Sequence, residues 1–94
     1  MPPGFEWDDA KAAANERKHG VTFAEAATVF ADPLAAVFGD PDHSEDEIRQ
    51  IVVGYSERDR LLVVSHTSRP PHLRIISARR ATSKERHKHE QNPL

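Results

Sequence analysis

The residues most capable of chemistry gather near the end of the chain, in the segment 73–90. Two adjacent arginines, Arg79 and Arg80, precede Thr82 and Glu85, whose spacing is that of a helix capping box. The first turn of a helix exposes unpaired N–H groups and carries a partial positive charge, so arginines just before it form a place where a phosphate can bind. Further cationic or titratable side chains continue along the predicted helix: Lys84, Arg86, His87, Lys88 and His89.

One reaction that fits these side chains is the cleavage of an RNA phosphodiester without a metal ion. It needs a base for the 2′-OH proton, cations for the charge that develops on the phosphate, and an acid for the leaving 5′-oxygen. Strand alternation predicts Arg79 on the face of Ser77 and opposite to Arg74, so we expect Arg79 with Arg80 to clamp the phosphate. The alternative for these arginines is ion pairing with carboxylates of the first half. The cations expected to contact the RNA around the clamp are Arg69, Arg74, Lys84 and Arg86.

Three further side chains are candidates for catalytic acid–base roles. His66 ends a predicted central strand close to Arg69, and a histidine near cations can titrate around neutral pH. Taken alone, it is also typical of a hydrogen-bonded residue at a strand end. Glu85 and His89 are spaced i, i+4 on one helix face, where they can act as an orienting group and an acid–base group. The capping box alone also accounts for Glu85, and His89 can simply be exposed.

The sequence gives little support for metal or cofactor chemistry. His43 and Glu47 are spaced i, i+4 and with His19 and His66 can in principle surround an ion. No cysteine-containing, HExxH-type or EF-hand spacing is present, however, and glycine-rich phosphate loops and a nucleophile elbow are absent. We therefore expect no metal and no cofactor.

The charge is divided unevenly along the chain. The net charge is −2, but residues 1–57 hold four Lys/Arg and twelve Asp/Glu, whereas residues 58–94 hold nine and three. Such a division is typical of a nucleic-acid contact carried by the second half, although solvated charged faces give the same pattern. The chain has no cysteine and no apolar run of the length of a signal-peptide core or membrane span. These features predict a cytoplasmic protein without a membrane contact.

Two helices are predicted near the start of the chain. Residues 4–7 alternate in the manner of an edge strand, and a helix over residues 8–19 begins at an aspartate cap and ends before Gly20. A second capping box opens a helix over residues 22–32, which Pro33 terminates. Apolar residues recur in it at i, i+3, i+4 and i+7, as expected for a core-facing stripe: Phe23, Ala26, Ala27 and Phe30.

The rest of the chain predicts strands and one terminal helix. Residues 34–38 form an apolar run of strand length, and three β-rich runs joined by short turns predict an antiparallel meander: 48–55, 60–67 and 73–78. The terminal helix, 82–91, carries no large aliphatic side chain, so we expect it to be loosely attached or ordered by a partner. The expected fold is α+β, with the two early helices on one side of the sheet, in one domain spanning 1–94.

Seven segments, in this order, carry a further signal: FEWD (5–8), KHGVTFAEA (18–26), FADP (30–33), 43–49, GYS (54–56), LLVVSH (61–66) and IISAR (75–79). Together they resemble the BrnT toxins of type II toxin–antitoxin modules, over nearly the whole chain from Phe5 to Glu90. The resemblance implies a small α+β domain similar to RelE-type ribonucleases, which cleaves RNA and arrests growth.

The resemblance also implies partners. A toxin of this family is neutralised by a BrnA-type antitoxin with a ribbon-helix-helix part, and operator DNA is contacted only through their complex, which represses its own promoter. The terminal segment of the family resembles ISARxAT followed by a helix with Glu, Arg and Tyr; here Glu85 and Arg86 fill two places and His89 stands where the tyrosine is expected. We therefore expect a growth-inhibiting ribonuclease toxin. The alternative is a catalytically degenerate toxin that serves as an antitoxin-binding corepressor.

Overall fold

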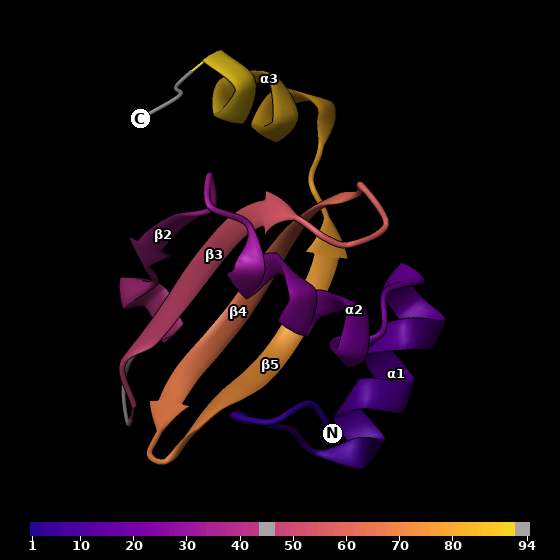
Figure 1. Cartoon of the computed structure of the whole chain (residues 1–94), viewed down its shortest axis with the longest axis vertical. Helices are drawn as coiled ribbons and strands as arrows, with labels where there is room; N and C mark the ends of the chain where they lie inside the picture. Colours follow the sequence, from indigo (N-terminus) through magenta and orange to yellow (C-terminus); the bar gives the residue numbers. More distant parts are fainter. Residues whose placement is uncertain (44–46, 92–94) are drawn as a thin grey trace.

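Five strands form a single sheet with the order β1-β5-β4-β3-β2 (Figure 1). The structure is a computed structural model that describes residues 1–43 and 47–91. Neighbouring strands are antiparallel except for β1, which pairs in parallel with β5. The predicted α+β class and the meander are confirmed, and two short strands widen the sheet at its edges. The strands are β1 (Phe5–Glu6), β2 (Ala36–Gly39), β3 (Arg49–Tyr55), β4 (Leu61–Arg69) and β5 (His72–Arg80).

The predicted helix caps are found at the start of the chain. The side chain of Asp8 accepts a hydrogen bond from the Lys11 N–H and begins α1 (Asp9–His19), which Gly20 ends in the left-handed conformation at φ 68°. Thr22 caps α2 (Phe23–Thr28) in the same way, and the chain continues as the 3-10 turn η1 (Val29–Ala31). The predicted capping box is only half formed, because the Glu25 carboxylate accepts hydrogen bonds from Ser56 and Arg60 instead. The remaining helical elements are η2 (Pro41–His43) and α3 (Ser83–Gln91).

The hydrophobic core lies between one face of the sheet and the segment that holds α2 and η1. Three of the four residues of the predicted stripe are buried, and the fourth, Phe30, is half-buried against the core. Helices α1 and α2 leave most of the opposite face uncovered, and α3 stands beyond one end of the sheet (Figure 1). We call this uncovered side the open face. The core cluster consists of Val21, Phe23, Ala26, Ala27, Val29, Val52, Leu62, Val64, Ile75 and Ala78.

A β-bulge in β5 changes the alternation of its side chains. Ser65 of β4 pairs with Ser77, but the next residue, His66, pairs with Ile75. Ile76 is therefore an extra residue on β5 that has no direct partner on β4. A bulge of this kind shifts every side chain beyond it to the other face of the sheet.

The bulge determines which arginines share a face. Ile75 and Ala78 are three residues apart, yet both face the core and are only 2% and 1% exposed. Because Arg74 pairs with Thr67 and Arg79 with Val63, both arginines lie on the open face. The prediction that they lie on opposite faces was wrong, since strict alternation does not hold across a bulge.

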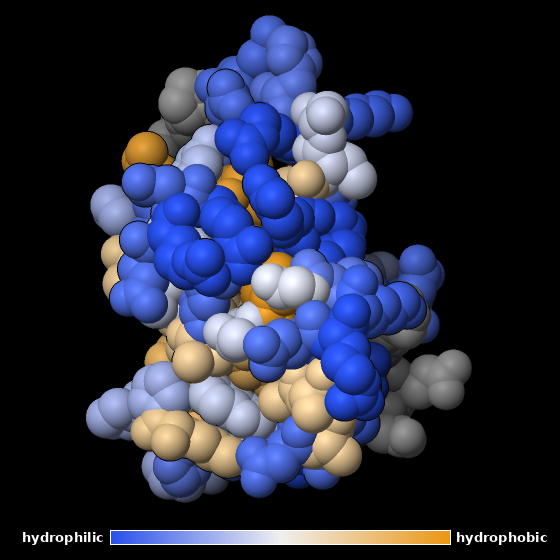
Figure 2. Space-filling view, turned by 90° about the vertical axis from the view of Figure 1, so that its right-hand side faces the viewer, coloured by the Kyte–Doolittle hydropathy of each residue, from blue (hydrophilic) through white to orange (hydrophobic). Residues whose placement is uncertain are grey.

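Asn15 attaches α1 to the free edge of β5. The amide nitrogen of Asn15 donates to the carbonyl oxygens of Ala78, at 2.8 Å, and Val21, at 3.0 Å. Its side-chain oxygen accepts from the Ala78 N–H at 3.1 Å. The side chain thus replaces the neighbouring strand that β1 is too short to supply. The side of the molecule that faces the viewer in Figure 2, on which α1 lies, is largely hydrophilic over its upper part and middle.

Asn15→Ala should lower the free energy of unfolding by about 2–4 kcal/mol, measured by urea denaturation. The change removes three hydrogen bonds worth about 1 kcal/mol each and leaves two backbone groups of Ala78 without partners. The control is Glu16→Ala, at an exposed position of the same helix, which should change the free energy by no more than about 0.5 kcal/mol. Equal losses in the two variants would contradict this account of how α1 is attached.

Candidate active site

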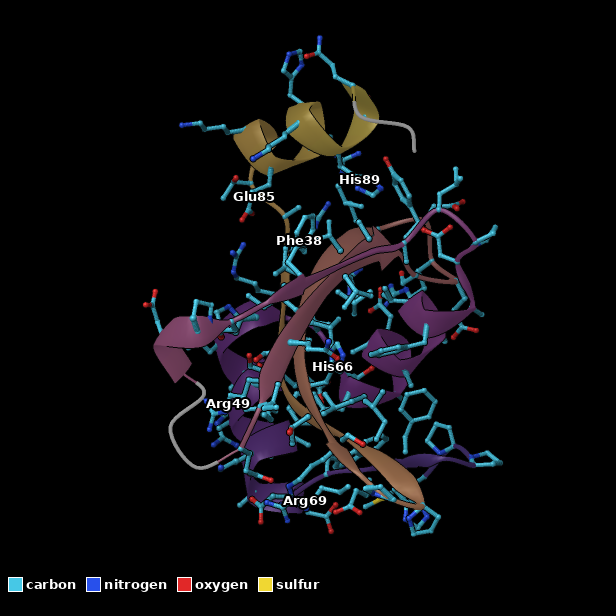
Figure 3. All side chains as sticks on the ribbon, turned by 90° about the vertical axis from the view of Figure 1, so that its left-hand side faces the viewer. Phe38, Arg49, His66, Arg69, Glu85 and His89 are labelled. Atoms are coloured by element: carbon cyan, nitrogen blue, oxygen red, sulfur yellow. The ribbon has the colours of Figure 1, made fainter. Side chains whose placement is uncertain are left out.

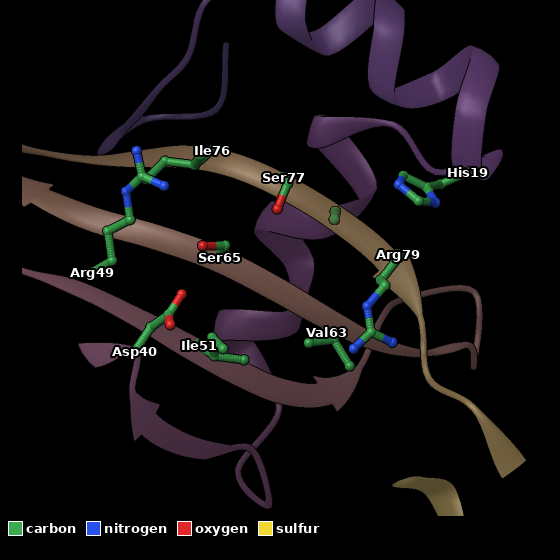
Figure 4. Close-up of a pocket in the computed structure, with 10 residues that line it drawn as sticks. His19, Asp40, Arg49, Ile51, Val63, Ser65, Ile76, Ser77 and Arg79 are labelled. Atoms are coloured by element: carbon green, nitrogen blue, oxygen red, sulfur yellow. The ribbon is translucent and has the colours of Figure 1, made fainter. Parts of the chain in front are cut away.

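A hollow of about 230 Å³ lies on the open face, over β3, β4 and β5 (Figure 4). Ser65 and Ser77, which pair across β4 and β5, place their hydroxyl groups between Arg49 and Arg79. Hydroxyl donors flanked by guanidinium groups suit an anionic ligand. The other lining residues are His19, Asp40, Ile51, Val63, Ile76 and Ala78.

The hollow is elongated along the strands. Arg49 of β3 pairs with Thr67 of β4, and Arg79 of β5 pairs with Val63 of β4. These two β4 residues are four positions apart. At about 3.3 Å per residue, the two arginines are separated by about 13 Å along the strands, and by two strand spacings of about 4.8 Å across the sheet. A ligand that contacts both of them must therefore be extended.

Glu85 holds the guanidinium group of Arg79 by two hydrogen bonds. Nη1 donates to Oε1 at 2.8 Å and Nη2 to Oε2 at 2.9 Å. Oε1 also accepts from the Thr82 N–H, and the Thr82 hydroxyl accepts from the Glu85 N–H, so the predicted capping box is confirmed. The hydrogen bond from Arg79 lowers the pKa of Glu85 to about 2. Such a carboxylate is a poor proton donor at neutral pH, and its geometry instead positions Arg79.

Arg80 does not join Arg79 in a clamp. Its partner on β4 is Leu62, which faces the core, whereas the partner of Arg79 is Val63 on the open face. Adjacent strand residues point to opposite faces, so the structure does not bring the two guanidinium groups together over the hollow. The other predicted cations of this region, Lys84 and Arg86, lie on α3, exposed and half-buried respectively.

His66 lies on the core face, away from the hollow. It is 4% exposed, its ring stands edge-on to Phe30 at 5.0 Å between centroids, and Nδ1 is 3.4 Å from the Val64 carbonyl oxygen. Burial lowers the pKa of His66, which favours the neutral imidazole. Figure 3 shows it between the strands and α2, on the other side of the sheet from Arg49. The prediction that His66 lies near the arginines was wrong. The pairing of β4 with its neighbouring strands, which the sequence alone does not reveal, turns this side chain to the core face of the sheet.

Arg69 and Arg74 are held by carboxylates of the first half of the chain. Arg69 makes two hydrogen bonds to Glu47, at 2.8 and 3.0 Å, and Nη1 of Arg74 donates to Glu6 at 2.7 Å. The hydrogen bond from Arg69 lowers the pKa of Glu47. Arg69 and Arg74 therefore form the ion pairs with the first half of the chain that were the alternative to RNA binding, although both side chains lie on the open face.

His89 is turned toward β3. Its ring is 6.1 Å from that of Tyr55, and the side chain is half-buried. Together with the pair between Glu85 and Arg79, this contact attaches α3 to the end of the sheet (Figure 3). No residue of α3 is buried, in agreement with the prediction that apolar packing does not hold this helix.

Sequence reasoning did not assign the hollow residues Arg49, Ser65, Asp40 and His19. No local pattern marks them, because they meet only through strand register and the packing of α1. The i, i+2 spacing of Arg49 and Ile51 does predict that they share one face of a strand. It does not reveal which β4 residues lie opposite them.

Neither a metal cluster nor a membrane span is found in the part of the chain that the structure describes. No three His, Cys, Asp or Glu side chains there lie close enough together to hold an ion. The side chain of His43 lies outside the described part, and Glu47 is bound to Arg69. None of the described helices has the length and apolar character needed to cross a bilayer.

The fold is that of a small α+β protein whose open sheet face carries a hollow lined by arginine and serine side chains. Residues 7–85 match the family described as "Ribonuclease toxin, BrnT, of type II toxin-antitoxin system", and the chain belongs to this family, as the resemblance predicted. The crystal structure of the Brucella abortus ribonuclease toxin BrnT has a similar fold, with a TM-score of 0.65 and 24% identity over 84% of this chain and 96% of that one. A comparison with curated proteins found no match.

The attachment of α3 should depend on pH through Glu85. Because the pKa of Glu85 falls from 4.5 to about 2 on pairing, its contribution is complete above about pH 4.5 and is lost as the pH falls toward 2. Amide chemical shifts of residues 83–91, followed from pH 6 to pH 2, should report this release. Glu85→Gln should weaken the attachment at neutral pH and flatten the profile.

Glu90→Gln is the matched control, since it changes an exposed glutamate of the same helix. Its profile should follow that of the wild type, whereas coincident profiles for the wild type and Glu85→Gln would show that the ion pair does not hold α3.

Proposed function

We propose that this chain is a metal-independent endoribonuclease toxin that inhibits growth by cleaving RNA. The observation that carries the proposal is the elongated hollow on the open face, with Ser65 and Ser77 between Arg49 and Arg79. Cleavage of a phosphodiester increases the negative charge on the phosphate, and fixed guanidinium and hydroxyl donors stabilise that charge. Membership of a ribonuclease toxin family supports the same reaction.

Arg79 retains donors for a phosphate while it is bound to Glu85. A guanidinium group has five N–H donors. Glu85 takes one from each terminal nitrogen and the Arg80 carbonyl oxygen takes another from Nη1, at 3.3 Å, which leaves donors on Nε and Nη2. The carboxylate fixes the plane of the group, so little side-chain entropy is lost when a phosphate binds. We assign Arg79 and Arg49 to the phosphates of the substrate and Glu85 to the positioning of Arg79.

Proton transfer requires a group at the rim of the hollow. His19 lines the hollow from the end of α1, and an imidazole can both accept and donate a proton. A base removes the 2′-OH proton, O2′ attacks the phosphorus atom, and the 5′-oxygen leaves with a proton. The products are then a 2′,3′-cyclic phosphate and a 5′-hydroxyl, and we assign His19 to one of the two proton transfers.

A BrnA-type ribbon-helix-helix antitoxin is the proposed partner, with operator DNA contacted only through the complex. A toxin of a type II module acts with an antitoxin and on an RNA substrate, which supports this partner and a cytoplasmic location. Expression of the chain alone should stop growth, and co-expression with the antitoxin should restore it. Harmless expression together with an inactive purified protein would favour the corepressor alternative.

Incubating the purified protein with single-stranded RNA in EDTA tests the reaction itself. Cleavage should proceed at the same rate as with added magnesium, and the 3′ ends should carry 2′,3′-cyclic phosphates. Cleavage that requires magnesium, or products with 5′-phosphates, would contradict the proposed chemistry.

Variants of the adjacent arginines test the site on the same RNA. Arg79→Ala should lower kcat/KM by roughly 100-fold or more, the usual effect of removing a donor to a developing charge, and Arg80→Ala by less than about threefold. Since Arg79 also holds α3, Arg49→Ala provides a second variant that spares this helix, and it should also lower kcat/KM. A larger loss in Arg80→Ala than in Arg79→Ala would favour the clamp on the other face.

A further inference from the structure

Phe38 is exposed in a way that the other aromatic residues are not. It is 54% exposed, and within the described residues its ring contacts no other aromatic ring. Each of the other five lies within 6.1 Å of an aromatic or histidine ring and is buried or half-buried. An exposed aromatic side chain on an edge strand invites non-specific association, so its presence calls for a physical reason.

The register of β2 and β3 places Phe38 beside the hollow. Phe38 pairs directly with Ile51, and Ile51 lines the hollow. Side chains of directly paired residues share one face of the sheet, with Cβ atoms about 4.5–5.5 Å apart. Phe38 therefore lies on the open face, next to the Ile51 side of the hollow. Figure 3 shows it toward α3.

Val37 is as exposed as Phe38 but does not lie beside the hollow. It precedes Phe38 on the same strand and is 55% exposed, but it pairs with Val52 of the core cluster and so belongs to the other face. Leu34 and Ile48 are also exposed and lie outside the strands. Of these exposed apolar residues, only Phe38 pairs directly with a residue that lines the hollow.

We propose that Phe38 is a stacking platform for a nucleobase of single-stranded RNA whose phosphates lie in the hollow. This inference rests on the proposed function and adds a feature of the substrate. Bases stack on aromatic side chains largely irrespective of their identity, whereas a base inside a duplex has no free face. The protein should therefore bind single strands more tightly than duplexes of the same sequence, with only modest base preference.

Binding of a short, fluorescein-labelled RNA with 2′-O-methyl groups, which block cleavage, tests the platform by fluorescence anisotropy. Phe38→Ala should raise Kd by about 5- to 140-fold, the equivalent of the ~1–3 kcal/mol of one stacked base. Phe38→Trp should retain wild-type affinity or exceed it. Val37→Ala is the matched control, with the same exposure on the other face, and should stay within twofold of the wild type.

The salt dependence separates stacking from charge. Phe38→Ala should leave the slope of log Kd against log salt unchanged, whereas Arg49→Ala should reduce it by about 0.7 for one lost phosphate contact. An RNA with an abasic site at the stacked position should remove the difference between Phe38→Ala and the wild type.

Three results would overturn the inference. If the wild type binds and cleaves RNA but Phe38→Ala binds as tightly, the platform is excluded while the ribonuclease function stands. The same holds if Phe38→Ala weakens only the binding of the antitoxin, which would make Phe38 part of a protein interface. Absence of RNA binding and cleavage by the wild type would instead remove the proposed function and the platform together.

Discussion

The extra residue in β5 is the constraint on which the arrangement of this protein depends. Ile75 and Ala78 both enter the core although three residues separate them, and this is possible only because Ile76 interrupts the alternation. Burial of these side chains thereby turns Arg74 and Arg79 to the same open face. One local distortion thus serves the core on one side of the sheet and gathers cations on the other.

Four arginines of the second half that are hydrogen-bonded to carboxylates differ in where their acceptors lie. Arg60 is bound to the buried carboxylate of Glu25, and Arg69 and Arg74 are bound to Glu47 and Glu6, so these pairs join distant parts of the chain. Their acceptors come from the acidic first half, which explains much of the uneven charge. Arg79 differs, because its acceptor is Glu85, on the helix that follows directly. That pair fixes a guanidinium group at the end of the hollow and attaches α3 at the same time.

The elements of the fold could be predicted from local sequence, whereas the site could not. Capping residues such as Thr82 and Glu85 act within a few positions of the chain, and their geometry is as expected. The faces of Arg74 and His66 depend on a bulge and a register, which local alternation does not reveal. Asn15 was missed for a similar reason, since only its contact with the distant Ala78 gives it a role.

Mapping the contact surface of a bound RNA by NMR tests the central claim, that the open face of the sheet is the RNA-binding surface. Titration of the isotopically labelled protein with a 2′-O-methyl RNA should shift the amide signals of Ser65, Ser77 and Arg79 most strongly. The signals of α2 and of the core strand residues beneath it should change little. Shifts concentrated on α2 and η1, with the amides around the hollow unchanged, would contradict the account.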